Sequence, residues 1–454
     1  MSAGLQQNWW ATCASSAVDV PHESRKLRWL KRWIWIYFWL LIFEGSLRKW
    51  ILPSLSAPLL LVRDPIVLII YFQAFRCGKF TRKAMWPFAL LTVGLLLLAI
   101  AQIVAGSNTV LIALYGMRSY VLHIPLVIVM AETLTWKDVR EYGRWLLLIS
   151  IPMAALTVAQ YYAPDSAWIN LGAGVGARQI GAWGGHVRPA GTFSYGSGTQ
   201  SLAIFTSAFV IYAMSKRNVY PQWLVGSAAL ATLAAIPILG SRTVVFTMAF
   251  VFVFVLIAGL SDTARLARML GILVILSFFA IVALQLPFVA DSIETFSHRW
   301  GSDTSEGNVQ EVLQLRVLGV FESGFESVGS TPWLGDGIGM GSNAAAVLKT
   351  GSQSFLLAEM EWERIVMEFG PIFGLMFLGL RVFCVIYLAQ RSLRALRRNN
   401  MLPWLLLPVV APPIIIYTLE QPTNLGFIVL GAGLLLAAAR SEKPALDAQE
   451  LQTR

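Results

Sequence analysis

Long apolar runs separated by short polar stretches are the dominant pattern of this chain. Twelve such runs can be drawn, and most approach the length of about 20 apolar residues that lets a helix cross a bilayer. They lie at residues 33–52, 57–75, 86–105, 111–131, 145–162, 201–214, 223–239, 244–260, 269–290, 365–388, 402–417 and 425–439. The pattern therefore predicts an all-α integral membrane protein with about twelve membrane-spanning helices.

Basic residues cluster before the first run and in every second link after it. Lysine and arginine accumulate on the cytoplasmic side of membrane proteins, so both termini are predicted to be cytoplasmic. The external side then receives a glycine-rich loop at residues 163–199 and a long loop at residues 291–363. The predicted division is a cytoplasmic segment 1–32, helices over 33–290, the large external loop 291–363, helices over 364–439 and a cytoplasmic tail 440–454.

The long external loop has helical patterns of its own. Apolar residues recur at helical spacing over residues 309–328, which predicts an amphipathic helix lying on the membrane or covering a cavity. Residues 332–341 are rich in glycine and read as a turn-rich loop. Residues 353–368 read as a second helix that leads into the tenth apolar run.

Composition agrees with a membrane protein and narrows the alternatives. Only 13% of the 454 residues are charged, compared with about 25% in soluble domains. The net charge of +10 is explained by the basic links, so we do not expect a nucleic-acid partner. The three cysteines show no metal-ligand spacing, and neither a metal nor a cofactor is expected.

Several ionisable residues fall inside the apolar runs, where a charge is costly and needs a reason. They are Glu44, Arg48, Lys49, Arg63, Asp64, Arg118 and His123. One interpretation is structural pairing between these groups, for example of Glu44 or Asp64 with a nearby arginine. The other is a polar cavity that opens to the external side. The sequence leaves both interpretations open.

Arginines on the predicted external side run against the positive-inside trend. They are Arg188, Arg242, Arg316 and Arg364. The guanidinium fork matches phosphate oxygens, so several converging arginines would bind a diphosphate and stabilise it as a leaving group. Ordinary anchoring at the membrane surface is the alternative, and we favour phosphate binding for Arg188 and Arg242.

A run of glutamates precedes the tenth apolar run. It comprises Glu359, Glu361, Glu363 and Glu368. A carboxylate at this place could act as general base on a sugar hydroxyl. The alternative is a solvated helix N-terminus, where the helix dipole favours acidic residues.

Segments on the predicted external side resemble the motifs of one family. They are Arg188-Pro-Ala-Gly-Thr-Phe, Gly240-Ser-Arg242, Arg316 followed by Pro332-Trp-Leu-Gly-Asp-Gly-Ile-Gly339, and Glu368-Phe-Gly-Pro-Ile-Phe-Gly374. The stretch Phe43-Glu-Gly-Ser-Leu-Arg-Lys-Trp50, with Arg63-Asp-Pro65, is also similar to members of the group. In their order, these segments resemble the O-antigen ligase and Wzy-type polysaccharide polymerase superfamily of bacterial envelopes.

The resemblance implies a GT-C-like glycosyltransferase of the bacterial inner membrane, with its active site facing the periplasm. Its donor would be an oligosaccharide on undecaprenyl diphosphate. Its acceptor would be a second lipid-linked repeat unit for a polymerase, or a lipid A core for a ligase. Arg188 and Arg242 would hold the donor diphosphate, and Glu359 or Glu361 would deprotonate the acceptor hydroxyl. Further substrate-binding candidates are Arg316, Arg364, Arg118, His186 and Arg63.

One departure from the family pattern bears on the choice between these activities. Ligases of the family carry a histidine shortly before the Glu-x-Gly segment, and residues 357–362 contain none. We therefore expect a polymerase, with the ligase as the alternative. A lipid-linked glycan flippase is the alternative from another class, although the chain shows neither related halves nor paired broken helices. Implied protein partners are a chain-length regulator and a flippase.

Overall fold

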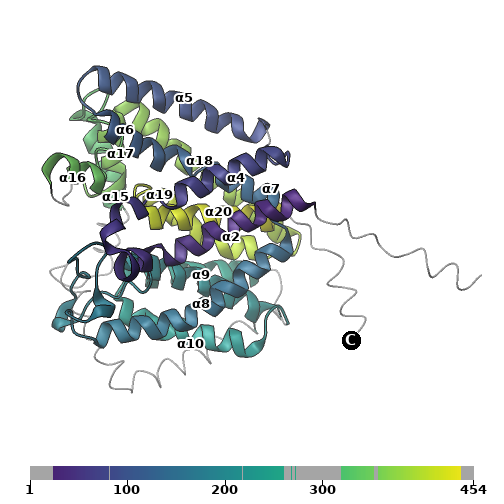
Figure 1. Ribbon diagram of the computed structural model, residues 1–454. Helices are drawn as coiled ribbons and strands as arrows, with labels where there is room; N and C mark the ends of the chain where they lie inside the picture. Colours follow the sequence, from purple (N-terminus) through teal and green to yellow (C-terminus); the bar gives the residue numbers. More distant parts are fainter. Residues whose placement is uncertain are drawn as a thin grey trace, which may run out of the picture.

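The computed structural model describes residues 24–80, 82–216, 218–259, 267, 271, 318–351 and 356–440. Within these residues the chain is helical, and its only β-structure is two isolated bridges before α9. The long helices are α2 (Arg25–Ser46), α4 (Arg63–Arg76), α5 (Arg82–Val104), α8 (Trp136–Tyr162), α9 (Gly196–Ser215), α10 (Gln222–Leu239), α11 (Arg242–Gly259), α18 (Pro371–Arg397), α19 (Leu402–Ile416) and α20 (Pro422–Arg440) (Figure 1).

Shorter elements occupy mainly one end of the bundle. The α-helices among them are α3 (Ser56–Leu59), α6 (Val110–Met117), α7 (Leu126–Thr133), α15 (Gly319–Glu326), α16 (Asn343–Thr350) and α17 (Glu361–Phe369). Two π-helical turns, η1 (Leu47–Ile51) and η3 (Arg118–Leu122), continue α2 and α6. The 3-10 turns are η2 (Pro53–Leu55), η4 (Trp168–Asn170), η5 (Trp183–Gly185) and η7 (Ser327–Gly329).

Eight helical segments of the described chain are long and apolar enough to cross a membrane. They are Pro53–Arg76, Met85–Val104, Val110–Thr133, Trp136–Tyr162, Gln222–Leu239, Arg242–Gly259, Pro371–Arg397 and Pro422–Arg440. Helix α19 is apolar but shorter. The first and sixth predicted runs form α2 and α9, which fall outside this set, and the ninth run lies outside the described residues. The all-α, multi-span prediction is confirmed, whereas the count of about twelve stays a prediction.

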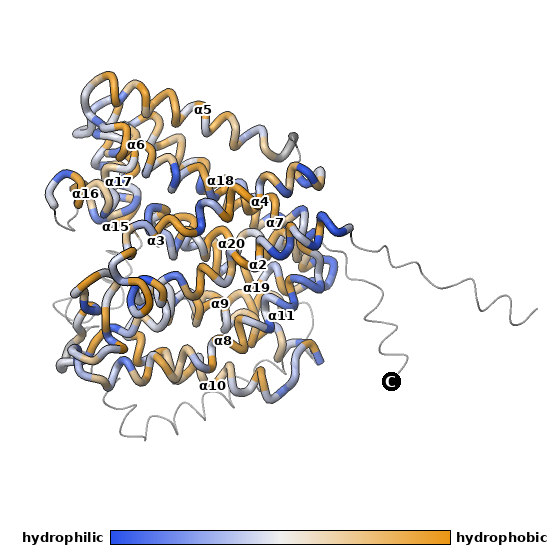
Figure 2. The backbone as a smooth tube through the Cα atoms, in the orientation of Figure 1, coloured by the Kyte–Doolittle hydropathy of each residue, from blue (hydrophilic) through white to orange (hydrophobic). Residues whose placement is uncertain are grey.

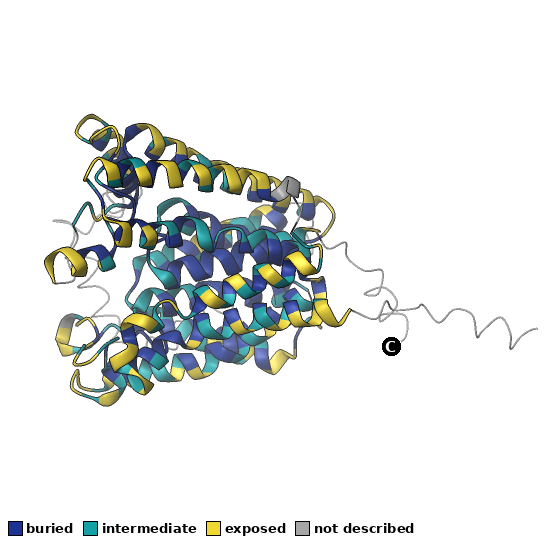
Figure 3. Cartoon of the chain, turned by 45° about the horizontal axis from the view of Figure 1, so that its top comes forward, coloured by how far each residue is buried: buried dark blue, intermediate teal, exposed yellow. Residues whose placement is uncertain are grey.

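The outer helices present apolar side chains to their surroundings, as lipid-facing helices do. Trp86, Leu97 and Val104 on α5 are between 62% and 83% exposed. Leu68 and Phe72 on α4 are each more than half exposed. In contrast, 83% of the apolar window of α20 is buried among its neighbours. Figures 2 and 3 show α5 at the edge of the bundle, apolar and largely exposed. A surface of this kind on a soluble monomer would be unusual.

Polar contacts tie the helix ends together at each end of the bundle. At one end, Lys31 pairs with Asp138 at 2.7 Å, and Arg440 pairs with Glu132 at 2.8 Å. These contacts gather the start of α2, the end of α7, the start of α8 and the end of α20. This is the grouping expected if the helices alternate in direction as the basic links predict. Which end faces the cytoplasm stays a prediction.

The tenth predicted run is interrupted where a continuous helix was expected. Gly370 separates α17 from α18 with a φ of +78°, and Pro371 begins the new helix. A positive φ ends a helix, and proline is favoured in the first helical turn, so this pair sets the boundary. Arg364 and Glu368 therefore lie on a separate short helix before α18. The predicted boundary between residues 363 and 364 falls inside α17.

The two helices expected in the long external loop differ from the prediction in their bounds. The described part of the first, from residue 318, forms α15 and η7, and the rest lies outside the described residues. The second begins at Glu361, because residues 356–360 form turns and bends.

Close backbone packing fixes the loop between η7 and α16 against α6. Gly339 adopts a φ of +85°, and a Cβ placed there would lie 2.6 Å from the carbonyl oxygen of Ile112. Neither the conformation nor the space suits a side chain. The glycine-rich loop is therefore held at the end of α6 by direct backbone contact.

We predict that Gly339→Ala lowers the free energy of unfolding by more than about 1 kcal/mol, because alanine must adopt a positive φ and displace Ile112. The matched control is Gly379→Ala on α18, where nothing lies within 4 Å of the added methyl group. Thermal unfolding in detergent measures both. Equal melting temperatures for the two variants would contradict the packing described here.

Candidate functional site

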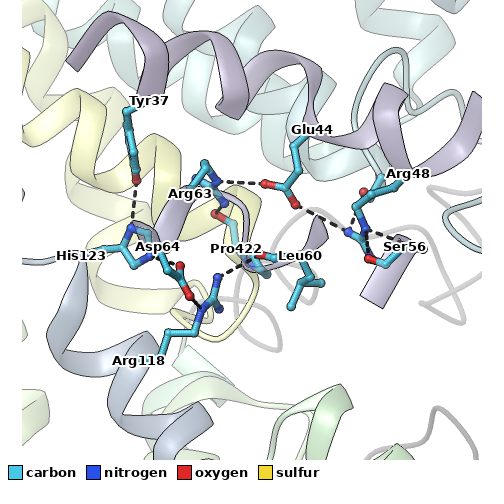
Figure 4. Close-up of polar contacts among 11 residues, drawn as sticks. Tyr37, Glu44, Arg48, Ser56, Leu60, Arg63, Asp64, Arg118, His123 and Pro422 are labelled. Carbon is cyan, nitrogen blue, oxygen red and sulfur yellow. Dashed lines mark hydrogen bonds and ion pairs between the residues drawn. The ribbon is translucent and has the colours of Figure 1, made fainter. Parts of the chain in front are cut away.

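Charged side chains from α2, η1, α4 and η3 meet at the end of the bundle that is predicted to be external. We call this group the arginine cluster; it consists of Glu44, Arg48, Arg63, Asp64 and Arg118 (Figure 4). The two π-helical turns supply two of its three cations, Arg48 and Arg118. Such turns widen a helix locally and are frequent at functional sites.

Arg63 joins three helices and is almost completely buried. Its Nε donates to Glu44 Oε2 at 2.9 Å, and its Nη2 donates to the Pro422 carbonyl oxygen at 2.6 Å. Its Nη1 faces α20, where a Cβ on Gly426 would collide with it. This geometry gives Arg63 a structural role, clamping α4 to α2 and α20. Its predicted contact with substrate stays a prediction.

Arg118 is held by α4 but keeps one N–H group uncommitted. Its Nε donates to Asp64 Oδ2 at 2.5 Å, and its Nη2 donates to the Leu60 carbonyl oxygen at 3.0 Å. Its Nη1 is buried without a hydrogen-bond partner. Asp64 also contacts His123 Nε2 at 2.9 Å. A fixed guanidinium with a spare donor is a suitable group for binding an anion.

Arg48 and Lys49 connect the cluster to the loop that contains Arg188. The Arg48 Nη1 donates to Ser194 Oγ at 2.9 Å, and the Lys49 Nζ donates to the Gly191 carbonyl oxygen at 2.5 Å. Arg48 shares its carboxylate with Arg63, because Glu44 lies 3.7 Å from Arg48 and 2.9 Å from Arg63. The cluster therefore holds three cations against two carboxylates. Structural pairing accounts for part of it and leaves a cationic excess.

The loop with the Arg-x-x-Gly-Thr-Phe motif is rigidly built. Gln160 Oε1 accepts the Gly191 N–H at 2.7 Å, and Thr192 Oγ1 donates to the Ile42 carbonyl oxygen at 2.7 Å. Gly191 has a φ of +56°, which favours glycine. Arg188 is half-buried on this loop, and its Nε is buried without a hydrogen-bond partner. The motif thus positions Arg188 relative to α2 and α8.

The other predicted phosphate ligands occupy separate elements. His186 stacks on Tyr161 with ring centroids 4.1 Å apart, and its Nδ1 lies 3.0 Å from the Tyr161 carbonyl oxygen. Arg242 begins α11 directly after the α10 turn at Gly240. Arg316 lies outside the described residues. Convergence of Arg188 and Arg242 on one ligand stays a prediction.

The two predicted bases have very different surroundings. Glu359 is exposed on the turn before α17. Glu361 is buried, pairs with Arg364, and accepts a hydrogen bond from Arg381 Nη1 at 2.5 Å. Arg381 also donates to the carbonyl oxygens of Ile414 and Tyr417 at the end of α19. A carboxylate held by two arginines is a weak base, so this geometry favours an anchoring role for Glu361.

Glu368 anchors the glycine-rich loop at residues 332–341. Its carboxylate accepts hydrogen bonds from the Tyr120 hydroxyl at 2.9 Å and from the N–H groups of Gly339 and Gly341 at 3.1 and 2.7 Å. Gln102 binds the Glu368 carbonyl oxygen and the Ile338 N–H. Two segments singled out in the sequence, Pro332–Gly339 and Glu368–Gly374, are thus joined by one buried carboxylate.

One buried carboxylate was missed by the sequence reasoning. Glu420 lies on the turn between α19 and α20, 6% exposed, and neither of its oxygens has a hydrogen-bond donor. Burial, together with the nearby Glu368 carboxylate, raises the pKa of Glu420 well above its ordinary value, and Arg364 offsets this only in part. The sequence signal that could have identified Glu420 is a charged residue in the short break between the apolar runs 402–417 and 425–439.

In the part of the chain that the structure describes, no three histidine, cysteine, aspartate or glutamate side chains are grouped so as to hold a metal ion. The chemistry that the described residues offer is anion binding by guanidinium groups and proton transfer to a carboxylate.

We predict that Glu361→Gln destabilises the fold by about 3–5 kcal/mol, because two buried arginines lose their carboxylate. The matched control is Glu359→Gln, an exposed position expected to change stability by less than about 0.5 kcal/mol. Thermal unfolding in detergent compares the variants. A Glu361→Gln protein as stable as the control would exclude the anchoring role.

Comparison with known proteins adds no assignment to this geometry. No protein-family model matches the chain, and no curated protein matches it. The functional interpretation therefore rests on the contacts of the described residues.

Proposed function

We propose that this protein joins lipid-linked oligosaccharide repeat units at the external face of the bacterial inner membrane. The donor oligosaccharide would be carried on undecaprenyl diphosphate, and the second unit would be the acceptor. A hydroxyl of the acceptor attacks the anomeric carbon of the donor, and the lipid diphosphate leaves. No nucleotide sugar is needed, because the donor bond already holds the required energy.

The cationic excess of the arginine cluster is the observation that carries this proposal. Three buried arginines face two carboxylates at one end of an apolar helical bundle, and Arg118 keeps an N–H group without a partner. Uncompensated charge in a low-dielectric site is expensive, so an anionic ligand is expected to complete the balance. A diphosphate at the membrane surface would supply that charge.

The same charges would assist the reaction itself. When the anomeric C–O bond breaks, negative charge builds on the leaving diphosphate. Fixed guanidinium groups stabilise this charge without reorganising. Arg118 is fixed in this way by Asp64 and by the Leu60 carbonyl oxygen.

A polymerase is favoured over a ligase by the residues before the Glu-x-Gly segment. The ligase histidine is absent from residues 357–362, and that stretch holds Glu359 and Glu361 instead. Transfer to a lipid A core is the alternative reaction, and it would use the same donor and the same leaving group.

The activity is tested by supplying the purified protein with lipid-linked oligosaccharide extracted from a host strain that lacks it, without nucleotide sugar. Glycans of increasing length on the lipid are the expected result. Transfer only after a lipid A core is added would replace the polymerase with a ligase. Movement of the lipid between leaflets without a new glycosidic bond would overturn the proposal in favour of a flippase.

Replacing the guanidinium group of Arg118 by an amine, in Arg118→Lys, is expected to reduce product formation about 10–100-fold. A hydrogen bond to a charged group contributes about 1.5–3 kcal/mol. Arg118→Lys keeps the charge next to Asp64 and limits the effect on folding. The matched control is Arg440→Lys, whose partner Glu132 lies at the opposite end of the bundle. Equal rates for the two variants would remove Arg118 from the site.

We also expect Arg188→Ala and Arg242→Ala each to abolish product while leaving expression intact. Both arginines lie on elements at the predicted external end, and both would contribute charge to diphosphate binding. Product formation in the assay above, compared at equal protein amounts, checks this. A variant with near-normal product would show that the arginine it lacks is not part of the mechanism.

A further inference from the structure

The turn between α19 and α20 places a buried carboxylate beside the arginine cluster. Pro422, two residues after Glu420, accepts a hydrogen bond from Arg63. Gln421 donates to Ser197 Oγ at 3.2 Å, and Ser197 lies three residues from Ser194, the partner of Arg48. The two residues that follow Glu420 in the chain are therefore held close to the partners of Arg63 and Arg48.

Tyr115 provides a third link between Glu420 and the cluster. It lies within electrostatic range of Arg118, Arg48 and Glu420 at once. Its ring also lies near Arg118, whose guanidinium carbon is 5.5 Å from the ring centroid. Arg118 and Glu420 thus share Tyr115 as a neighbour.

The buried carboxylates at this end differ in what they bind. Glu44 and Glu361 are paired with arginines, and Glu368 accepts three hydrogen bonds. Glu420 has no donor, and its nearest cation is the Nε of Arg364 at 3.8 Å. Arg364 is itself committed to Glu361. Glu420 is therefore the buried carboxylate in the described chain that is left without a donor.

We propose that Glu420 accepts the proton of the acceptor hydroxyl when the glycosidic bond forms. This assignment rests on the proposed function and replaces Glu359 and Glu361 as candidate bases. The hydroxyl oxygen bonds to the anomeric carbon, its proton moves to the Glu420 carboxylate, and the bond to the lipid diphosphate breaks with both electrons on the leaving oxygen. One proton is transferred and no co-reactant is required.

The surroundings of Glu420 suit a proton acceptor. A general base is most effective when its pKa lies near the working pH, and an ordinary carboxylate is too acidic. Burial and the Glu368 carboxylate raise the pKa of Glu420, against the opposing charge of Arg364. Tyr115 on α6 and Tyr120 on η3 are the other titratable groups that face it. Glu368 is held by three donors, and its carboxyl group also interacts directly with that of Glu420.

The test compares Glu420→Gln with the wild type and with the matched control Glu326→Gln, an exposed position on α15, in the lipid-linked oligosaccharide assay without nucleotide sugar. The amide has the shape of the carboxylate and removes a buried charge that has no donor, so folding should be retained, as thermal unfolding would show. We expect the rate to fall about 10²–10⁴-fold, the range typical of a general base. Binding of undecaprenyl diphosphate should be unchanged.

The pH profile separates proton transfer from a structural effect. A base must be deprotonated to act, so wild-type activity should fall as the pH drops through the pKa of Glu420. Because that pKa is raised, the fall should lie at a higher pH than for an ordinary glutamate. Glu420→Asp should keep this acid limb at a reduced rate, and Glu420→Gln should lose it.

The outcomes distinguish this assignment from the proposed function. If the wild type forms glycosidic bonds and Glu420→Gln retains a near-wild-type rate, Glu420 is not the base and the polymerase proposal stands. Loss of lipid diphosphate binding together with the rate in Glu420→Gln would also overturn the assignment, because the residue would then act in binding. A wild type that forms no glycosidic bond overturns both proposals.

Discussion

Pairing of buried guanidinium groups with carboxylates and carbonyl oxygens holds one end of the helical bundle together. Arg63 joins α4 to α2 and α20, Arg118 joins η3 to the start of α4, and Arg381 joins α18 to α17 and the end of α19. Buried charges are costly unless they are paired and hydrogen-bonded, so these elements have few alternative arrangements. The positions of the remaining polar groups depend on this network.

Two of the groups that the network leaves incompletely satisfied have complementary chemistry. Arg118 keeps a spare N–H donor, and Glu420 keeps a carboxylate without a donor. The Ser194–Ser197 segment and the Pro422 carbonyl oxygen hold the two regions near each other. Glycosyl transfer from a lipid diphosphate needs a cation for the leaving group and a base for the acceptor. Unsatisfied buried groups of this kind are where function is expected.

The glycine-rich loop at residues 332–341 adds a second rigid element at the same end. Glu368, Gln102 and the close approach of Gly339 to α6 fix this loop through buried hydrogen bonds and backbone contact. Its role in the described structure is to tie α17 to the bundle. The motif residues of this segment are therefore explained by architecture, whereas those of the arginine cluster retain charge that the architecture does not use.

The sequence by itself determined the helical membrane class, because long apolar runs have few stable alternatives in a bilayer. Pairing of Glu44 or Asp64 with a nearby arginine was one of the two interpretations that it left open. The tertiary structure decided which pairs form: Arg63 pairs with Glu44, and Arg118 pairs with Asp64, in each case between different helical elements. It also separated Glu361 from Glu359, and it left Glu420 without a donor. Hydropathy is a local property and can be read along the chain. Charge compensation depends on which helices pack together, and only the folded bundle sets that.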